Sequence, residues 1–200
     1  MSLDKIKPNQ RLIVAISGAS GAIYGVRALQ IIKRAGVESH LIISKAAALS
    51  LGAELDMTLA DVQAMADVVY KPADIGAAIA SGSFKTLGML IAPCSVKTLG
   101  EITTGVTSSL ISRAADVCLK ERRRLVLMVR ETPLHLGHLR SMAAVTEMGA
   151  IVAPPMPAFY THPQNLDEMV EQNVARVLDL FGIEVAMKRW GEDVGLSTDG

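Results

Sequence analysis

Continuous apolar runs alternate along the chain with stretches whose apolar residues recur at helical spacing. The runs at 11–17, 38–43, 88–92 and 124–129 are rich in Val, Ile and Leu and predict strands. Because polar residues do not alternate within these runs, both faces of the strands are predicted to be buried, which is typical of a parallel sheet covered by helices. The pattern therefore predicts a doubly wound, Rossmann-like α/β fold with a mainly parallel sheet and helices on both faces.

Helices are predicted after each of the first three strands and again later in the chain. The first extends to Ala35, the next two start at Ser44 and Ser95, and three longer helices are expected at 109–120, 139–148 and 166–181. The sequence contains no internal repeat, linker or second core. We therefore expect one domain over residues 1–200, with a polar C-terminal segment, 183–200, that extends outward.

The charge balance limits the kinds of partner. The 200 residues include 20 Lys and Arg against 20 Asp and Glu, so the electrostatic footprint of a protein that binds nucleic acid or an anionic membrane is missing. Half of the residues are apolar and the mean hydropathy is +0.34, which is high for a soluble monomer. We therefore expect a homo-oligomer with no nucleic-acid or membrane partner.

The residue pattern also indicates where the protein is located and whether it binds a metal. The first ten residues are polar, and no apolar run approaches the roughly 18 residues of a membrane span, so a cytoplasmic protein is predicted. Cys94 and Cys118 lack metal-ligand spacing and are expected to stay reduced. The four histidines form no metal-binding motif, and we expect no metal.

Candidate chemistry lies in the loops after the predicted strands, since parallel strands present their carboxyl ends at one edge of a sheet. The segment S-G-A-S-G-A-I-Y-G at 17–25 directly follows the first strand. Its small residues let backbone N–H groups approach a phosphate, and Gly25 would let the following helix pack closely on the sheet. The segment is neither a G-x-G-x-x-G nor a Walker loop, and a tight turn without a ligand is the alternative. Ser20 has no G-x-S-x-G frame, which disfavours a hydrolase.

Two further loops place polar side chains at this edge. The turn P-C-S-V-K-T at 93–98 could hold a flavin through its amides and hydroxyls, whereas the alternative is that Ser95 only caps a helix. Arg130 and Glu131 follow a buried strand directly. An arginine there can bind a phosphate and a partly desolvated glutamate can move a proton, while an Arg–Glu surface pair is the alternative.

Cations and aromatic residues recur later in the chain. Arg113 and Lys120 are seven residues apart, which places them on one face of a predicted helix and suggests an anion. The following run, 122–124, is interpreted as a solvated helix end. The rigid segment 154–160 precedes the helix that carries Arg176, and its aromatic residues either pack in a lid or cover a planar or allylic group.

Taken in order, these segments resemble the UbiX-type flavin prenyltransferases, which share the flavoprotein type of this fold. The matching motifs span nearly the whole chain: S-G-A-S-G-A-I-Y-G at 17–25, S-K-A-A at 44–47, A-E-L-D at 53–56, S-G-S-F at 81–84, P-C-S-V-K-T at 93–98, R-A-A-D-V-C-L-K-E-R-R at 113–123, V-R-E-T-P-L-H at 129–135, P-P-M-P-A-F-Y at 154–160 and R-W-G at 189–191. Each motif alone is weak, but their order and spacing are specific.

The resemblance implies transfer of a dimethylallyl group from dimethylallyl phosphate to N5 and C6 of reduced FMN. The product, prenylated FMN, would pass to a UbiD-type decarboxylase, in ubiquinone synthesis or in aromatic acid breakdown. The family assembles as a dodecamer, which agrees with the apolar composition. Such chemistry needs cations on the departing phosphate and an aromatic lining that excludes water, and a departing monophosphate requires no metal.

The resemblance also assigns residues to roles. FMN is expected to be held by Gly18, Ala19, Ser20, Ser44, Ser95, Val96, Lys97, Thr98 and Arg130. The allylic phosphate is expected to be gripped, partly across subunit boundaries, by Arg113, Lys120, Tyr160 and Arg176. Residues expected to act in catalysis are Glu131, Lys120, Glu54, Ser20 and Trp190. Glu131 is expected to be the base that removes the C6 proton.

Two other functions are weighed against this one. A flavin-dependent cysteine decarboxylase of the same fold would require a P-A-S-A-N-T turn, and the chain has P-C-S-V-K-T at that place. A non-catalytic FMN carrier would fit the glycine and hydroxyl loops, but it would not need Lys120, Glu131, Tyr160 and Arg176.

Overall fold

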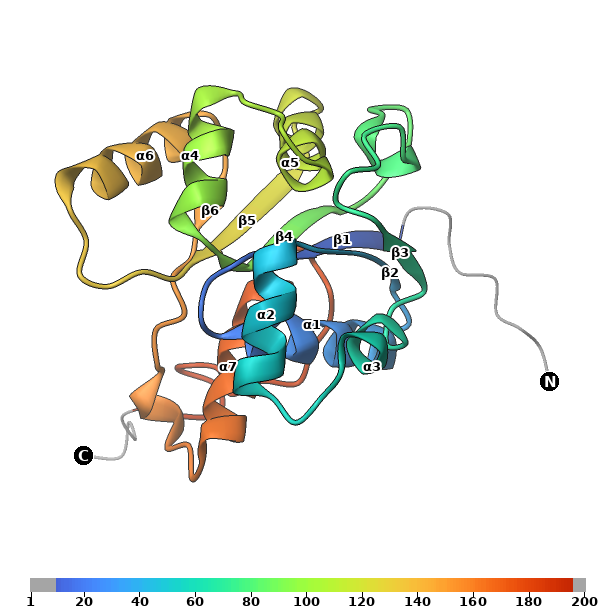
Figure 1. Cartoon of the computed structure of the whole chain (residues 1–200). Coiled ribbons are helices and arrows are strands. Elements are labelled where there is room, and N and C mark those ends of the chain that lie inside the picture. The colour runs from blue at the N-terminus through green and yellow to red at the C-terminus, as the bar shows by residue number, and fades with distance from the viewer. Residues whose placement is uncertain (1–9, 196–200) are drawn as a thin grey trace.

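The computed structural model describes residues 10–195, in which six parallel strands form one sheet (Figure 1). The strand order is β3-β2-β1-β4-β5-β6. The strands are β1 (Arg11–Ile16), β2 (Glu38–Ile43), β3 (Val68–Tyr70), β4 (Gly88–Cys94), β5 (Arg124–Val129) and β6 (Ile151–Val152). The order reverses between β1 and β4, and ligands of open α/β sheets bind at such a switch point. The predicted doubly wound fold is confirmed.

Helices cover both faces of the sheet (Figure 1). One face carries α1 (Ala22–Arg34), α2 (Lys45–Glu54), α3 (Leu59–Gln63) and α7 (Leu166–Asp179). The other face carries α4 (Val96–Thr104), α5 (Leu110–Lys120) and α6 (Leu136–Glu147). Two short 3-10 turns, η1 (Ala78–Ala80) and η2 (Phe159–Thr161), lie in the connections. Between residues 10 and 195, none of the helices combines the length and the apolar character needed to cross a membrane.

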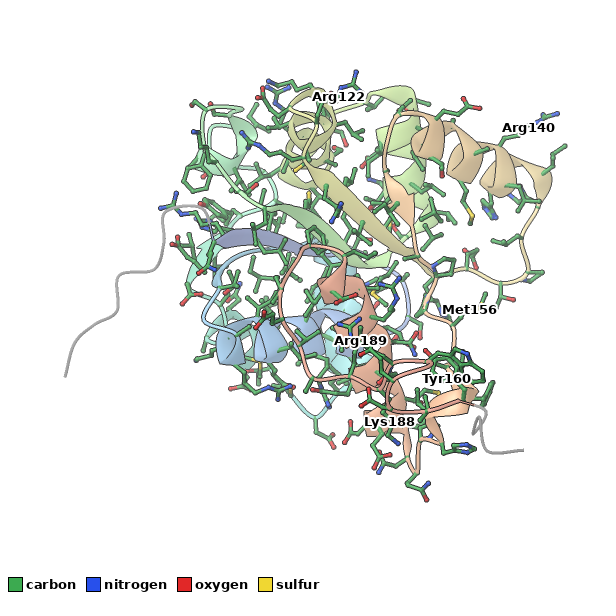
Figure 2. The ribbon with its side chains drawn as sticks, turned by 180° about the vertical axis from the view of Figure 1, so that it is seen from behind. Arg122, Arg140, Met156, Tyr160, Lys188 and Arg189 are labelled. Carbon is green, nitrogen blue, oxygen red and sulfur yellow. The ribbon has the colours of Figure 1, made fainter. Side chains whose placement is uncertain are left out.

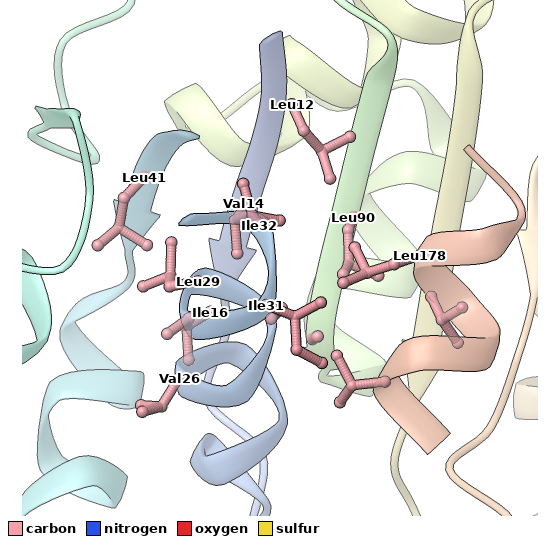
Figure 3. Packing of buried hydrophobic residues seen from close by; sticks show 14 of the residues in the cluster. Leu12, Val14, Ile16, Val26, Leu29, Ile31, Ile32, Leu41, Leu90 and Leu178 are labelled. Atoms are coloured by element: carbon pink, nitrogen blue, oxygen red, sulfur yellow. The ribbon is translucent and has the colours of Figure 1, made fainter. Parts of the chain in front are cut away.

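The core has two halves, one on each side of the sheet. Leu12, Val14 and Ile16 of β1 point to the half formed with α1 and α7, which Figure 3 shows. Ile13 and Ala15 point to the half formed with α4, α5 and α6. Strands buried on both faces explain why the apolar runs do not alternate with polar residues.

Strand and helix boundaries follow the sequence prediction closely, with differences at short elements. Strands β3 and β6 were not predicted because they have only three and two residues and lie at the sheet edges, where their side chains are partly exposed. Helix α6 begins three residues earlier than predicted, since the Nδ1 atom of His135 accepts a hydrogen bond from the Gly137 amide at 3.0 Å and caps the helix.

The segment after Gly182 runs back along α7 over its described part, residues 183–195. Ile183 is buried, and Gln172 on α7 exchanges two hydrogen bonds with the backbone of Lys188. The remaining residues of the predicted polar segment, 196–200, and the N-terminal residues 1–9 lie outside the described residues.

Gly25 lets α1 lie directly against the sheet. A Cβ atom at this position would lie 2.5 Å from the carbonyl oxygen of Ala92 and 2.6 Å from the Cγ1 atom of Ile16. The close helix packing predicted from the sequence is therefore confirmed, and any side chain would push α1 away from β1 and β4.

The substitution Gly25→Ala should destabilise the protein by about 1–3 kcal/mol, because the added methyl group overpacks a filled interface. The matched control is Gly52→Ala in α2, where a Cβ atom meets nothing within 4 Å and alanine favours the helix. Urea unfolding at equal protein concentration measures both changes. Equal stability of the two variants would contradict this account of the packing.

Candidate functional site

Ser17 joins the two loops that meet at the switch point. Its buried hydroxyl donates to the carbonyl oxygen of Pro93 at 2.9 Å and accepts from the Ser95 amide at 2.8 Å. The end of β1 is thereby tied to the loop after β4. No separate role was predicted for Ser17, although its place at the end of a buried strand marks it as the first residue of the site.

The glycine loop presents backbone amides to an anionic oxygen. Gly21 adopts a φ of +99°, and the N–H groups of Gly21 and Ala22 both donate to Oε2 of Glu54, at 2.8 and 3.0 Å. At Gly18, a Cβ atom would lie 2.3 Å from the Cβ atom of Ala46, so the loop is tight. The start of α1 holds an oxyanion here, as the helix dipole favours.

Serines cap the helices that start at the same edge. Ser44 accepts from the Ala47 amide at 3.0 Å, and Ser95 accepts from the Thr98 amide at 3.3 Å. The capping role considered for Ser95 is therefore confirmed. The cap starts α4 at the site, and the first amides of a helix have no partner within the helix. The side chain of Lys97 is exposed and pairs with Glu101 at 2.5 Å.

Arg130 and Glu131 emerge beside these loops. The Arg130 amide donates to the Cys94 carbonyl oxygen at 3.1 Å, which continues the pairing of β5 with β4. Burial raises the pKa of the Tyr24 hydroxyl on α1, and the positive charge of Arg130 partly opposes this shift. Glu131 is exposed and accepts only from the adjacent Thr132 amide, at 3.0 Å, among the described residues. Within residues 10–195 no ion pair joins Arg130 to Glu131.

Arg113 and Lys120 share one face of α5, as predicted, but each has an acidic neighbour. Arg113 pairs with Asp116 at 2.7 Å and Lys120 pairs with Glu121 at 2.6 Å. Lys120 precedes the start of β5, whereas Arg130 directly follows the end of β5. Because six strand residues span about 20 Å, the sheet separates Lys120 from Arg130 within one chain.

The basic run after α5 has a different environment from the one predicted. Arg123 donates to the carbonyl oxygen of Phe84 at 2.6 Å and also to that of Gly82. It therefore fastens the loop before β4, and its interpretation as part of a solvated helix end is wrong. Arg122 and Arg124 are exposed, in agreement with that interpretation.

A third group of predicted residues surrounds a pocket of about 340 Å³ beside β6. Tyr160 and Arg176 line it together with Pro154 and Met156 of the rigid segment. The rings of Tyr160 and Trp190 meet edge to face, with centroids 5.4 Å apart. The structure therefore brings Tyr160, Arg176 and Trp190 to one place, near Lys188 and Arg189 (Figure 2).

The thiols of Cys94 and Cys118 belong to none of the groups of candidate residues described above. Burial raises the pKa of Cys94 and of Cys118 to about 12, so neither thiol is a nucleophile at neutral pH. Over residues 10–195, no cluster of three or more His, Cys, Asp or Glu side chains could hold a metal ion.

A glycine loop whose amides can hold an anionic oxygen, at the switch point of a doubly wound sheet, is typical of nucleotide- or flavin-binding α/β proteins. In agreement, the Flavoprotein family model matches residues 2–185. Flavin prenyltransferase UbiX of Escherichia coli K12 is 57% identical over 185 residues, which cover 90% of this chain and 98% of that protein. The chain therefore belongs to the UbiX flavin prenyltransferase family.

Two crystal structures resemble the fold closely. AnUbiX (PadA1), in complex with FMN and dimethylallyl pyrophosphate, has a TM-score of 0.90 and 46% identity, covering 92% of this chain and 98% of that one. A dodecameric FMN-dependent UbiX-like decarboxylase from Escherichia coli O157:H7 has a TM-score of 0.87 and 48% identity, covering 90% and 98%.

The substitution Ser17→Ala should lower the free energy of unfolding by about 1–3 kcal/mol, because it leaves the Pro93 carbonyl and the Ser95 amide buried without this partner. Ser50→Ala is the matched control, since the Ser50 hydroxyl makes only a 3.4 Å bond within its own helix. Thermal or urea unfolding measures both. If Ser17→Ala is no less stable than Ser50→Ala, the hydroxyl does not tie the two loops.

Proposed function

We propose that this chain transfers a dimethylallyl group from dimethylallyl monophosphate to N5 and C6 of reduced FMN. The observation that carries the proposal is the carboxyl edge of the sheet, where the amides of Gly21 and Ala22, which hold the Glu54 carboxylate in this structure, lie beside the loops joined by Ser17. Membership in the UbiX family supports this choice over a cysteine decarboxylase of the same fold.

The edge of the sheet is suited to FMN. When bound, reduced FMN supplies the electron-rich atoms that accept the dimethylallyl group. We assign its binding to the glycine loop, the two capped helix starts and the arginine after β5, that is, to Gly18, Ala19, Ser20, Ser44, Ser95, Val96, Lys97, Thr98 and Arg130. The tight loop at Gly18 and the oxyanion contact at α1 support the fit.

The leaving phosphate needs cations from more than one place. Arg113, Lys120, Tyr160 and Arg176 are assigned to it. Since the length of β5, about 20 Å, separates Lys120 from Arg130 within one chain, we assign Lys120 of a second copy to the flavin edge, together with Arg113 on the same helix. Apolar exposure supports such contacts, because α6 buries only Val145 fully and exposes Leu136 and Leu139. A homo-oligomer, up to the dodecamer of the Escherichia coli O157:H7 relative, is part of the proposal.

The remaining assigned residues act on protons and water. Glu131 stands at the flavin edge and takes the C6 proton, while Glu54 and Ser20 contact the reacting groups near the glycine loop. Trp190 and Tyr160 supply the aromatic lining that excludes water from an allylic cation. The product is handed to a UbiD-type decarboxylase. A reducing compartment such as the cytoplasm suits the free cysteines at 94 and 118.

One experiment separates the proposed function from the alternatives. Purified protein is incubated with reduced FMN and dimethylallyl monophosphate, and the flavin is then weighed by mass spectrometry. Addition of one dimethylallyl group supports the transferase. Recovery of unchanged FMN would instead favour a carrier or a decarboxylase.

The variants Arg130→Ala and Arg176→Ala should separate the two phosphate sites. Losing one charge-assisted hydrogen bond costs about 1.5–3 kcal/mol, which corresponds to roughly ten- to a hundredfold in affinity. Arg130→Ala should weaken FMN binding by this factor, measured by flavin fluorescence. Arg176→Ala should retain FMN and raise the KM for dimethylallyl monophosphate. Equal loss of FMN from both variants would show that the two sites are wrongly assigned.

The substitution Glu131→Gln should slow formation of prenylated FMN by roughly 10²- to 10⁴-fold, which is typical for removal of a positioned base, and should leave FMN binding intact. Glu147→Gln is the matched control, because Glu147 is an exposed residue at the end of α6. The absorbance of the flavin, followed in time at saturating substrates, measures the rate. A wild-type rate in Glu131→Gln would exclude the proton-transfer role, and a selective loss of FMN affinity would indicate positioning only.

A further inference from the structure

Residues 188–194, here called the C-terminal turn, are fastened to α7 beside the pocket of Tyr160 and Arg176. Gln172 donates to the Lys188 carbonyl oxygen at 2.9 Å and accepts from the Lys188 amide at 3.1 Å. The Lys188 ammonium donates to the Thr161 carbonyl oxygen at 2.6 Å. Lys188, Arg189 and Tyr160 are labelled in Figure 2. The turn is therefore held both to α7 and to the segment that carries Tyr160.

Asp179 lies between two arginines at this place. Nη2 of Arg189 donates to Oδ1 of Asp179 at 2.6 Å, and Nη1 of Arg176 donates to Oδ2 at 3.3 Å. The hydrogen bond from Arg189 is the main cause that holds the pKa of Asp179 below its ordinary value, so the carboxylate is charged at neutral pH. The three side chains together carry one net positive charge.

Trp190 directly follows Arg189, and its placement depends on the same anchor. Its ring meets that of Tyr160 edge to face, and 60% of its surface is exposed. Within the described C-terminal turn, backbone bonds such as Gly191 to Val194, at 2.7 Å, shape the turn but do not reach α7. The contacts of Lys188 and Arg189 therefore determine where the Trp190 ring lies.

We propose that Arg189 is a positioning residue, which through Asp179 holds the Arg176 guanidinium at the pocket and, through the C-terminal turn, holds Trp190 against Tyr160. The proposal rests on the proposed function, in which Arg176 grips the phosphate of the allylic substrate.

The charge balance explains why a second arginine is needed. With Asp179 alone, Arg176 would sit in a neutral pair, and a phosphate would compete with the carboxylate for the same guanidinium. Arg189 donates to both carboxylate oxygens of Asp179, at 2.6 Å to Oδ1 and 3.4 Å to Oδ2, and so neutralises the carboxylate that would otherwise hold Arg176 in a neutral pair. Without Asp179 to hold it, the exposed Arg176 side chain would also lose rotamer freedom when it binds a phosphate.

The test uses the full chain with FMN bound and compares Arg189→Met with Arg189→Lys. Arg34→Met is the matched control. Arg34 of α1 forms an exposed ion pair with Glu171 of α7, the helix that also carries Asp179, but at a place away from Asp179. The KM and kcat for dimethylallyl monophosphate are measured, together with the fluorescence of Trp190, which is the single tryptophan of the chain. Binding of inorganic phosphate is titrated in parallel by the same fluorescence.

Arg189→Met should raise the KM about tenfold and weaken inorganic phosphate by a similar factor, with kcat changed less than about threefold. The Trp190 emission should shift to longer wavelength as the ring leaves Tyr160. Arg189→Lys should recover part of both effects, and Arg34→Met should match the wild type. An unchanged KM, or a raised KM with unshifted emission, overturns the proposal. If the wild type forms no prenylated flavin, the proposed function fails, and phosphate affinity then decides the role of Arg189: an unchanged affinity in Arg189→Met overturns it.

Discussion

The contact between the ends of β1 and β4 determines the rest of the site. Gly25 allows α1 to lie against Ala92, and the Ser17 hydroxyl joins the Pro93 carbonyl to the Ser95 amide. Together these contacts place the starts of α1 and α4, which cover opposite faces of the sheet, at its switch point. The amides at the start of α1 hold the Glu54 carboxylate, which shows that backbone groups at this edge can hold an anionic oxygen, and the order of the strands brings Arg130 to the same edge.

The direction of the strands supports the proposal that two copies contribute to one site. Lys120 precedes β5 and Arg130 follows it, so the two residues lie at opposite ends of this strand. Glu121, the acidic partner of Lys120, is exposed, and we propose that a phosphate replaces it when another copy approaches. The exposed apolar residues of α6 and the high mean hydropathy are consistent with extensive contact between copies.

Much of the fold could be predicted from sequence because its strands are buried on both faces and its helices begin at capping serines. Ser44, Ser95 and Ser109 each cap a helix at or next to a predicted start. The short strands β3 and β6 could not be predicted, because their two or three residues carry no periodicity. The contacts of Arg123 with Gly82 and Phe84, and of Arg189 with Asp179, join segments that only tertiary structure brings together.

The central claim is that one site takes Glu131 from one copy and Lys120 from another. Glu131→Gln and Lys120→Met variants, each inactive alone, are dissociated, mixed in equal amounts and allowed to assemble, and formation of prenylated FMN is measured. Random assembly restores both native side chains in about a quarter of shared sites, so about a quarter of the wild-type activity is expected. Activity no greater than that of the separate variants would contradict the shared site.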